Sequence, residues 1–157
     1  MPLLITSHKT PIGTLNLLAD DQILIGANLS TVSAFKVGRD VKVVKSIPVI
    51  SDLISDYFDG DLTALNGIQV RQPGAAFSQA AWKAMRKIAP GKTFSYSDLA
   101  EKAGSPAAVR AAGSACANNA IMLVVPCHRV VKTGGALGNY AYGVDKKQWL
   151  LSHEGFL

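Results

Sequence analysis

The sequence predicts an α/β N-terminal domain over residues 1–72, followed by a mostly helical C-terminal domain over residues 73–157. Short β-prone runs separated by turn residues fill the first 45 positions, and one amphipathic stretch follows them. Beyond residue 74 the apolar spacing becomes helical, and serine caps and glycine stops recur. Arg71-Gln72-Pro73-Gly74 is the predicted boundary.

In the first half, each β-prone run ends at a turn signal. We expect strands over residues 3–6, 13–19, 23–29 and 41–45, and a helix over residues 48–58 that Asp59-Gly60-Asp61 stops. The seven aspartates of this half are scattered, and no cluster of His, Cys or acidic residues occurs. This half is therefore interpreted as structural.

Three helices are predicted in the second half. Ser78 is the expected N-cap of a helix that runs to about Ile88. Ser95 or Ser97 caps a short helix over residues 98–103, closed by Gly104. Ser105-Pro106 opens a third helix over residues 107–118. The last two helices, joined by a tight turn, have the outline of a helix-turn-helix.

Composition excludes several classes of protein. Of the 157 residues, 48% are apolar and 17% charged, which is typical of a folded chain. Two cysteines cannot form a multi-bridge framework, and no secretory leader or membrane-length apolar run occurs. Without CxxC or HxxxH spacing, we expect no metal site. The expected location is the cytoplasm, or the nucleus if the source is a eukaryote.

Positive charge is concentrated in the second half. Residues 1–74 carry six basic and seven acidic residues, whereas residues 75–157 carry ten basic and four acidic ones. A basic domain suits a polyanion such as nucleic acid, but a small positive excess also keeps proteins soluble. Charge alone leaves both interpretations open.

The third helix of this half consists almost entirely of small residues, with Arg110 as its one long polar side chain. Small residues allow close packing against another helix. They would equally allow the helix to lie in a nucleic-acid groove with Arg110 as a probe. The two interpretations are compatible if one face packs and the other docks.

Cys127 is the main candidate for chemistry. The apolar run 121–125, expected to be a buried strand, leads into Pro126-Cys127-His128-Arg129. Nearby positive charge lowers a thiol pKa from about 8.5, and the thiolate is the nucleophile. The alternative is that Cys127 is a small buried apolar residue. Cys116, which lies among alanines, is interpreted as structural.

These residues resemble the O6-alkylguanine-DNA alkyltransferases, a family of DNA repair proteins. The similarity extends over about eighty residues and is weaker in the N-terminal half. Its motifs are Phe77-Ser78-x-x-x-Trp82, Gly91-Lys92-Thr93-x-Ser95-Tyr96, Ala108-Val109-Arg110-Ala111-x-Gly113, Asn119, Pro126-Cys127-His128-Arg129-Val130, Gly138-Asn139-Tyr140 and Leu150-Leu151-x-His153-Glu154-Gly155.

The resemblance implies a role for each matching residue. Cys127 would accept the alkyl group, and His128, oriented by Glu154, would remove the thiol proton through a water. Tyr96 would hydrogen-bond the leaving guanine, and Lys147 would add positive charge. The implied DNA-binding residues are Arg110, Ala111, Ser95, Tyr96, Ala107, Gly113 and Arg129; the hinge is Asn119; and the substrate pocket comprises Val130, Ala141, Tyr142 and Met122.

The implied activity is irreversible, single-turnover transfer of an alkyl group from O6-alkylguanine in duplex DNA to Cys127. Arg110 would fill the space left by the flipped nucleotide from the minor groove. The resemblance implies a ribonuclease-H-like N-terminal fold, no cofactor, no membrane association, and a monomer, several of which could bind along DNA. A non-catalytic lesion-binding protein and a Cys-His-Glu thiol hydrolase remain alternatives.

Two positions depart from the family's pattern. Asn119-Ala120 stands where the family usually has Asn-Pro, and Tyr140-Ala141-Tyr142-Gly143 stands where it has Tyr-x-Gly-Gly. We expect Tyr142 to narrow the pocket, so that methyl groups are accepted readily and benzyl-sized groups poorly.

Overall fold

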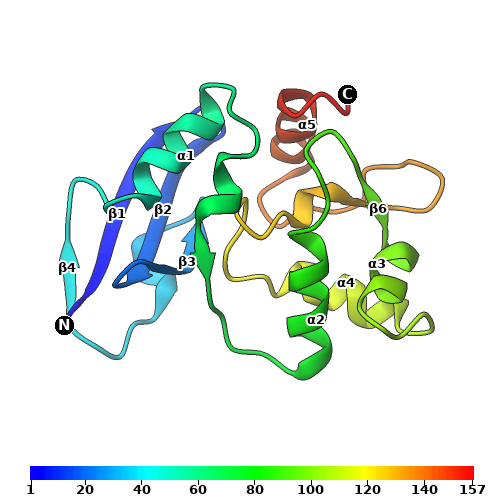
Figure 1. Ribbon diagram of the computed structural model, residues 1–157, viewed down its shortest axis with the longest axis horizontal. Helices are drawn as coiled ribbons and strands as arrows, with labels where there is room; N and C mark the ends of the chain where they lie inside the picture. Colours follow the sequence, from blue (N-terminus) through cyan, green and yellow to red (C-terminus); the bar gives the residue numbers. More distant parts are fainter. The chain divides into compact units, whose positions relative to one another are not determined.

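The computed structural model describes all residues from 1 to 157 and divides into two compact units (Figure 1). Unit 1 comprises Met1–Gln72 and Ala120–Val124. Unit 2 comprises Pro73–Asn119 and Val125–Leu157. The segment 120–124, assigned to the C-terminal domain from the sequence, thus packs with the N-terminal residues.

Unit 1 contains a mixed five-stranded sheet in the order β4-β1-β2-β3-β5, which places it in the α/β class (Figure 1). The strands β1, β2 and β3 form an antiparallel meander, β4 runs parallel to β1, and β5 runs parallel to β3. The elements are β1 (Leu3–Thr10), β2 (Gly13–Asp20), β3 (Ile23–Asn28), η1 (Val32–Phe35), β4 (Val41–Val43), α1 (Ile50–Phe58), η2 (Ala64–Gly67) and β5 (Gln69–Val70).

The predicted strands and helix of this half are confirmed, with β1 longer than expected and the two-residue β5 missed. The turn between β1 and β2 explains the sharp reversal of the chain. Thr10 Oγ1 donates to Gly13 O at 2.7 Å and accepts from Ile12 N at 3.2 Å. Gly13 has a φ of +117°, which only glycine adopts readily.

The strand expected over residues 121–125 is wrong. Only Ile121 forms a bridge, to Ala27 of β3, and the chain then turns at Leu123, where φ is +73°. All five residues are nonetheless buried. A short apolar run reports burial but does not distinguish a strand from a buried turn.

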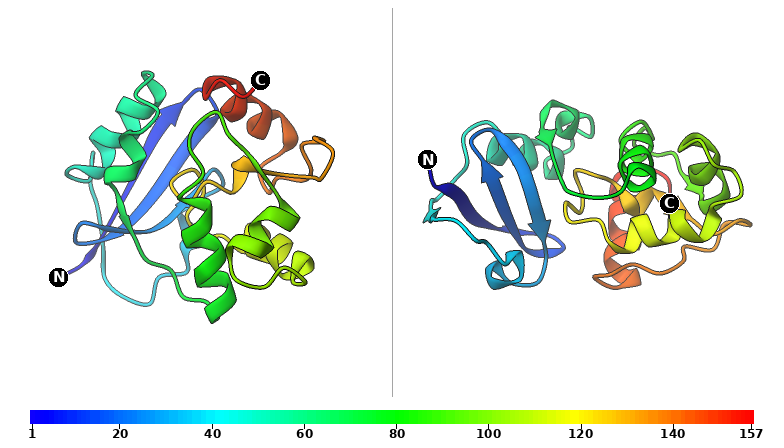
Figure 2. Two further views of the ribbon diagram at one scale, coloured as in Figure 1. Left: turned by 45° about the vertical axis from the view of Figure 1, so that its right-hand side comes forward. Right: turned by 90° about the horizontal axis from the view of Figure 1, so that it is seen from below.

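Unit 2 is mostly helical (Figure 2). Its helices α2, α3 and α4 pack against one another, and the two-residue strands β6 and β7 pair in parallel. None of the helices is long and apolar enough to span a membrane. The elements are α2 (Ala76–Met85), β6 (Phe94–Ser95), α3 (Tyr96–Lys102), α4 (Val109–Ala117), η3 (Cys127–Arg129), β7 (Val130–Val131) and α5 (Val144–His153).

One of the three predicted helix starts is confirmed. Ser95 caps α3 through a capping box, because its hydroxyl accepts from Asp98 N while the Asp98 carboxylate accepts from Ser95 N. Ser78 lies inside α2, which begins two residues earlier without a side-chain cap. The backbone oxygen of Ser105 instead accepts a hydrogen bond from Ala108 N in a turn, so α4 begins only at Val109.

The position of α4 is fixed by a buried tryptophan. Trp82 of α2 donates from its indole nitrogen to Ala115 O at 2.9 Å. Because a buried carbonyl without a partner is unfavourable, this bond sets the register of α4 against α2. The buried faces of Ala112 and Ala115 allow the close approach.

Candidate active site and nucleic-acid interface

Cys127 begins a single 3-10 turn whose three residues, Cys127, His128 and Arg129, are all buried. Its backbone N–H donates to Val125 O at 2.9 Å, and Arg129 N donates to Pro126 O at 3.0 Å. The tight turn directs consecutive side chains into different surroundings. The three neighbours in sequence can therefore take separate roles.

Glu154 is the buried acid to which His128 and Arg129 bind. His128 Nε2 lies 2.8 Å from Glu154 Oε2, and both side chains are fully buried. Arg129 donates from Nε to Oε1 at 2.8 Å and from Nη2 to Oε2 at 3.0 Å. Burial alone would raise the pKa of Glu154, but the bonds and charges of His128 and Arg129 outweigh it and hold the pKa far below its usual value.

The side chain of Arg129 faces inward, so this geometry does not support the predicted contact with DNA, which stays a prediction. Its side chain is 5% exposed, and its remaining guanidinium nitrogen, Nη1, donates to Ile88 O at 2.7 Å. Every nitrogen of the guanidinium is therefore bonded inside the protein. Arg129 instead anchors Glu154, a role that sequence reasoning missed. The only signal in the sequence was the position of Arg129 shortly after the apolar run 121–125. An arginine so close to a buried segment needs a counter-charge.

His128 is held as a neutral base. Burial lowers its pKa, against the opposing effect of Glu154. Because an ionised carboxylate can only accept, neutral His128 carries its proton on Nε2. Its other ring nitrogen, Nδ1, is buried and has no hydrogen-bond partner in the chain. A buried lone pair of this kind is suited to accept a proton.

The Cys127 thiol rests in its neutral form. Burial raises its pKa, while a hydrogen bond from the Asn119 side chain and the charge of Lys147 act in the opposite direction. Asn119 Nδ2 also donates to Val125 O at 2.8 Å, so this residue joins the end of α4 to the turn before the cysteine. The predicted hinge thus also contacts the thiol.

Lys147 and Tyr96 complete the surroundings of Cys127. Lys147 is buried on α5 and donates to Val130 O at 2.6 Å and to Asn139 O at 3.3 Å. Burial lowers its pKa. Tyr96 is half-buried at the start of α3, and its pKa is raised by burial and by the two nearby cysteine thiols. Burial also raises the pKa of Cys116 to about 12, so its thiol is unreactive at neutral pH.

The remaining predicted residues occupy varied positions. Val130 is fully buried, Tyr142 is half-buried with its pKa raised by burial and by Cys127, and Ala141 is exposed. Met122 belongs to the segment of unit 1 that bonds to Ala27. Its role in the pocket stays a prediction. No group of three or more His, Cys, Asp or Glu residues is arranged to hold a metal.

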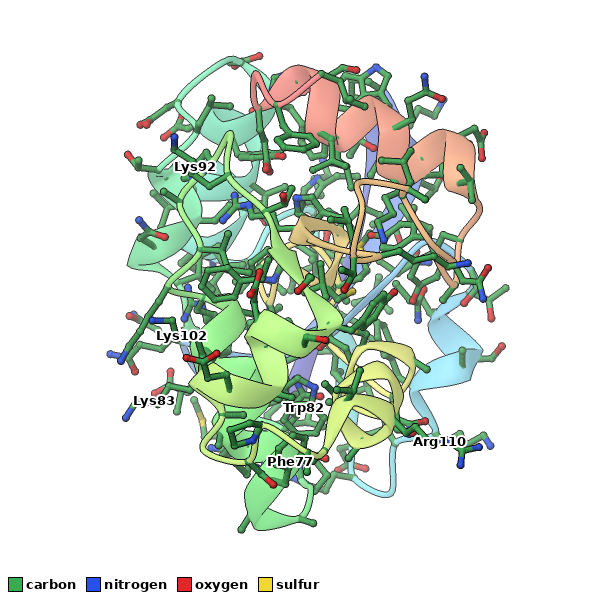
Figure 3. All side chains as sticks on the ribbon, turned by 90° about the vertical axis from the view of Figure 1, so that its right-hand side faces the viewer. Phe77, Trp82, Lys83, Lys92, Lys102 and Arg110 are labelled. Carbon is green, nitrogen blue, oxygen red and sulfur yellow. The ribbon has the colours of Figure 1, made fainter.

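The outer face of α4 is a smooth surface with one long side chain. Ala112 and Ala115 face inward, whereas Arg110, Ala111 and Ser114 are exposed. Figure 3 shows Arg110 projecting away from the ribbon. The packing interpretation of this helix is therefore confirmed, and docking of its exposed face in a nucleic-acid groove stays a prediction. Of the other predicted DNA-binding residues, Ala107 is exposed and Ser95, Tyr96 and Gly113 are half-buried.

In unit 2, two short packed helices, α3 and α4, accompany a buried cysteine that is followed by the buried His128-Arg129 pair and their partner Glu154. Residues 76–156 match the family model described as 6-O-methylguanine DNA methyltransferase, DNA binding domain. The chain therefore belongs to the 6-O-methylguanine DNA methyltransferase family, as the sequence motifs predicted.

Relatives and solved structures agree with this membership. The chain is 35% identical to a methylated-DNA–protein-cysteine methyltransferase of Shigella flexneri over 94% of its own length and 93% of the relative's. It is 44% identical to the Salmonella typhimurium protein of the same name, over 69% of this chain but only 63% of that relative. The Mycobacterium tuberculosis O6-methylguanine methyltransferase aligns with a TM-score of 0.85 at 31% identity, over 98% of this chain and 93% of that one. The M. tuberculosis OGT in complex with DNA aligns with a TM-score of 0.86 at 32% identity, over 97% and 92%.

Replacing Glu154 tests the buried charge group. Glu154→Gln keeps the shape of the side chain but leaves the Arg129 guanidinium buried without a counter-charge. We expect the free energy of unfolding, measured by urea denaturation, to fall by about 3–5 kcal/mol. Asp145→Asn is the control, since Asp145 pairs with Lys146 on the surface, and should change stability by less than about 0.5 kcal/mol. Equal effects of the two substitutions would contradict the assigned role of Glu154.

Proposed function

We propose that this chain repairs DNA by transferring an alkyl group, chiefly methyl, from the O6 atom of guanine in duplex DNA to Cys127 Sγ, once per molecule. The observation that carries the proposal is the state of His128, which follows the buried thiol of Cys127 in the same turn: its Nδ1 is unbonded and its Nε2 is held by ionised Glu154. Family membership and the exposed small-residue face of α4 support the choice of DNA as substrate.

Activation of the thiol is the first step. The thiol proton passes through a water to His128 Nδ1, and Glu154 stabilises the imidazolium that forms. This is the division of roles seen in hydrolase triads, with a cysteine as nucleophile. Lys147 and Asn119, which both favour the ionised form of Cys127, stabilise the thiolate as it develops.

Transfer then exchanges one bond for another. The Cys127 Sγ–carbon bond forms as the carbon–O6 bond breaks, and the electron pair of the broken bond remains on guanine. Tyr96, at the start of α3, donates a hydrogen bond to a guanine ring nitrogen and so stabilises the departing purine anion. The thioether product has no leaving group that water displaces readily, so each molecule reacts once.

Nucleotide flipping brings the lesion to the buried thiol. A base inside a duplex is inaccessible, and flipping it out costs a few kcal/mol. The small exposed residues of α4 let the helix approach the floor of the minor groove, and Arg110 enters the stack in place of the extruded nucleotide. Asn119, bonded both to the turn and to the thiol, keeps α4 and Cys127 in fixed register.

The proposal also includes the type of core in unit 1 and the cellular location of the reaction. The meander β1-β2-β3 with β4 parallel to β1 supports a ribonuclease-H-like core in unit 1, to which β5 adds an edge strand next to β3. We place the reaction in the cytoplasm, where DNA lies in the bacterial relatives.

Mass spectrometry of the reacted protein distinguishes the proposed transferase from the two alternatives. After incubation with a duplex that contains O6-methylguanine, we expect the tryptic peptide that carries Cys127 to gain one CH2 stoichiometrically. Cys127→Ala should gain nothing, and Cys116→Ala should react like the wild type. Binding of the duplex without an adduct would favour a lesion-binding protein. Repeated turnover of a small thioester or amide without an adduct would favour a hydrolase.

The pH dependence of the single-turnover rate tests the state of His128. Because burial lowers the pKa of His128 below its ordinary 6.5, the neutral base persists as the pH falls through 6.5. Because burial raises the pKa of Cys127 above 9.0, no rise from free thiolate should appear below that pH. We expect a plateau between these values and an acid limb centred below 6.5. An acid limb centred at or above 6.5 would contradict the assignment.

Tyr142 is expected to restrict the size of the transferred group. Replacing it with glycine, the residue usual in the family, should speed inactivation by O6-benzylguanine by roughly ten-fold or more. The assay measures residual methyl transfer after timed exposure to the inhibitor. Tyr142→Phe, which keeps the ring, is the matched control and should stay slow. Rapid inactivation of the wild type by low concentrations of the inhibitor would disprove this restriction.

A further inference from the structure

Three exposed lysines of unit 2 have no role in the site described so far. Lys83 lies in the last turn of α2, Lys102 in the last turn of α3, and Lys92 in the loop between α2 and β6. None of the three forms an ion pair. We refer to Lys83, Lys92 and Lys102 as the lysine margin.

The lysine margin and Arg110 are four of the six exposed basic side chains of unit 2, and the other two are Lys87 and Lys132. Arg129 and Lys147 are buried, and Lys146 pairs with Asp145. Among the acidic residues, Glu154 is buried, whereas Asp98, which caps α3, and Glu101 are both exposed on the same helix as Lys102. The three lysines of the margin outnumber these two acids, and none of the lysines forms an ion pair, so the margin carries a net positive charge.

The margin lies across the helix-turn-helix from Arg110. In Figure 3, Lys83 and Lys102 lie on one side of α3 and α4, Arg110 projects on the opposite side, and Lys92 lies further along the same edge as Lys102. In helix-turn-helix proteins the second helix lies in a groove and the first crosses the sugar-phosphate backbone. With α4 in the groove, α3 and the margin beyond it face a phosphate strand.

We infer that the lysine margin is a second DNA contact, which binds phosphates that flank the lesion on the side away from Arg110. The inference rests on the proposed function and extends it by giving the protein a longer footprint than α4 alone provides. Contacts to phosphates carry no sequence information, so the margin fixes orientation and raises affinity equally for damaged and undamaged DNA. The chemical step at Cys127 does not depend on it.

Salt dependence of binding provides the test. Each neutralised phosphate contributes about 0.9 to the slope of log affinity against log salt concentration. The triple variant Lys83→Gln, Lys92→Gln, Lys102→Gln should therefore show a slope smaller by about 2–3. Between about 50 mM and about 200 mM salt, the wild type should lose roughly forty-fold more affinity than this variant does.

The matched control is Lys36→Gln, Lys42→Gln, Lys45→Gln, which removes three exposed lysines from unit 1. Binding to a duplex with O6-methylguanine and to its undamaged counterpart is titrated for all three proteins. The inference predicts the slope change only in the margin variant, on both duplexes, with the methyl-transfer rate at saturating protein unchanged. An unchanged slope in the margin variant, or an equal change in the control, would overturn it.

The same samples separate this inference from the proposed function. If the wild type binds DNA but transfers no methyl group to Cys127, the proposed function fails while the salt titration still decides the role of the lysines. If methyl transfer occurs and the slopes of wild type and margin variant coincide, only the inference fails.

Discussion

The buried carboxylate of Glu154 is the interaction on which the site depends. An ionised acid with no solvent exposure requires compensation, and Arg129 supplies it through two hydrogen bonds while itself bonding to Ile88 O. With its charge secured, Glu154 can fix the orientation and the tautomer of His128. The free lone pair of His128 Nδ1 thus depends on the ion pair between Arg129 and Glu154, because Glu154 binds the opposite ring nitrogen, Nε2.

The same arrangement explains why Cys127 stays a neutral thiol before substrate binds. Burial raises the pKa of the thiol and lowers that of the imidazole, so neither group is charged before substrate arrives. A neutral thiol is a poor nucleophile toward unrelated electrophiles, and this protects a residue that, in the proposed function, reacts only once. Lys147 and Asn119 act in the opposite direction on the thiol and favour its ionised form. Reactivity is therefore tied to the geometry of the pocket rather than to a permanently ionised sulfur.

Much of this organisation was predictable from sequence because it depends on local pattern. The strands of unit 1 and a helix cap at Ser95 or Ser97 followed from spacing and cap signals, and the Cys-His-Glu set followed from motif resemblance. The inward turn of Arg129 was not predictable, because its partner Glu154 lies 25 residues away and the bond depends on tertiary packing. The turn at Leu123 was missed for a related reason. Apolar runs report burial, whereas the bridge from Ile121 to Ala27 depends on a strand distant in sequence.

The proposed mechanism requires His128 to be a neutral base that is protonated on Nε2 and bonded to ionised Glu154. Nitrogen-15 NMR of the His128 ring at neutral pH tests it most directly, because the two ring nitrogens have distinct shifts in each tautomer and in the imidazolium. We expect a protonated Nε2 and an unprotonated Nδ1 in the unreacted protein. An imidazolium, or a proton on Nδ1, at neutral pH would contradict it.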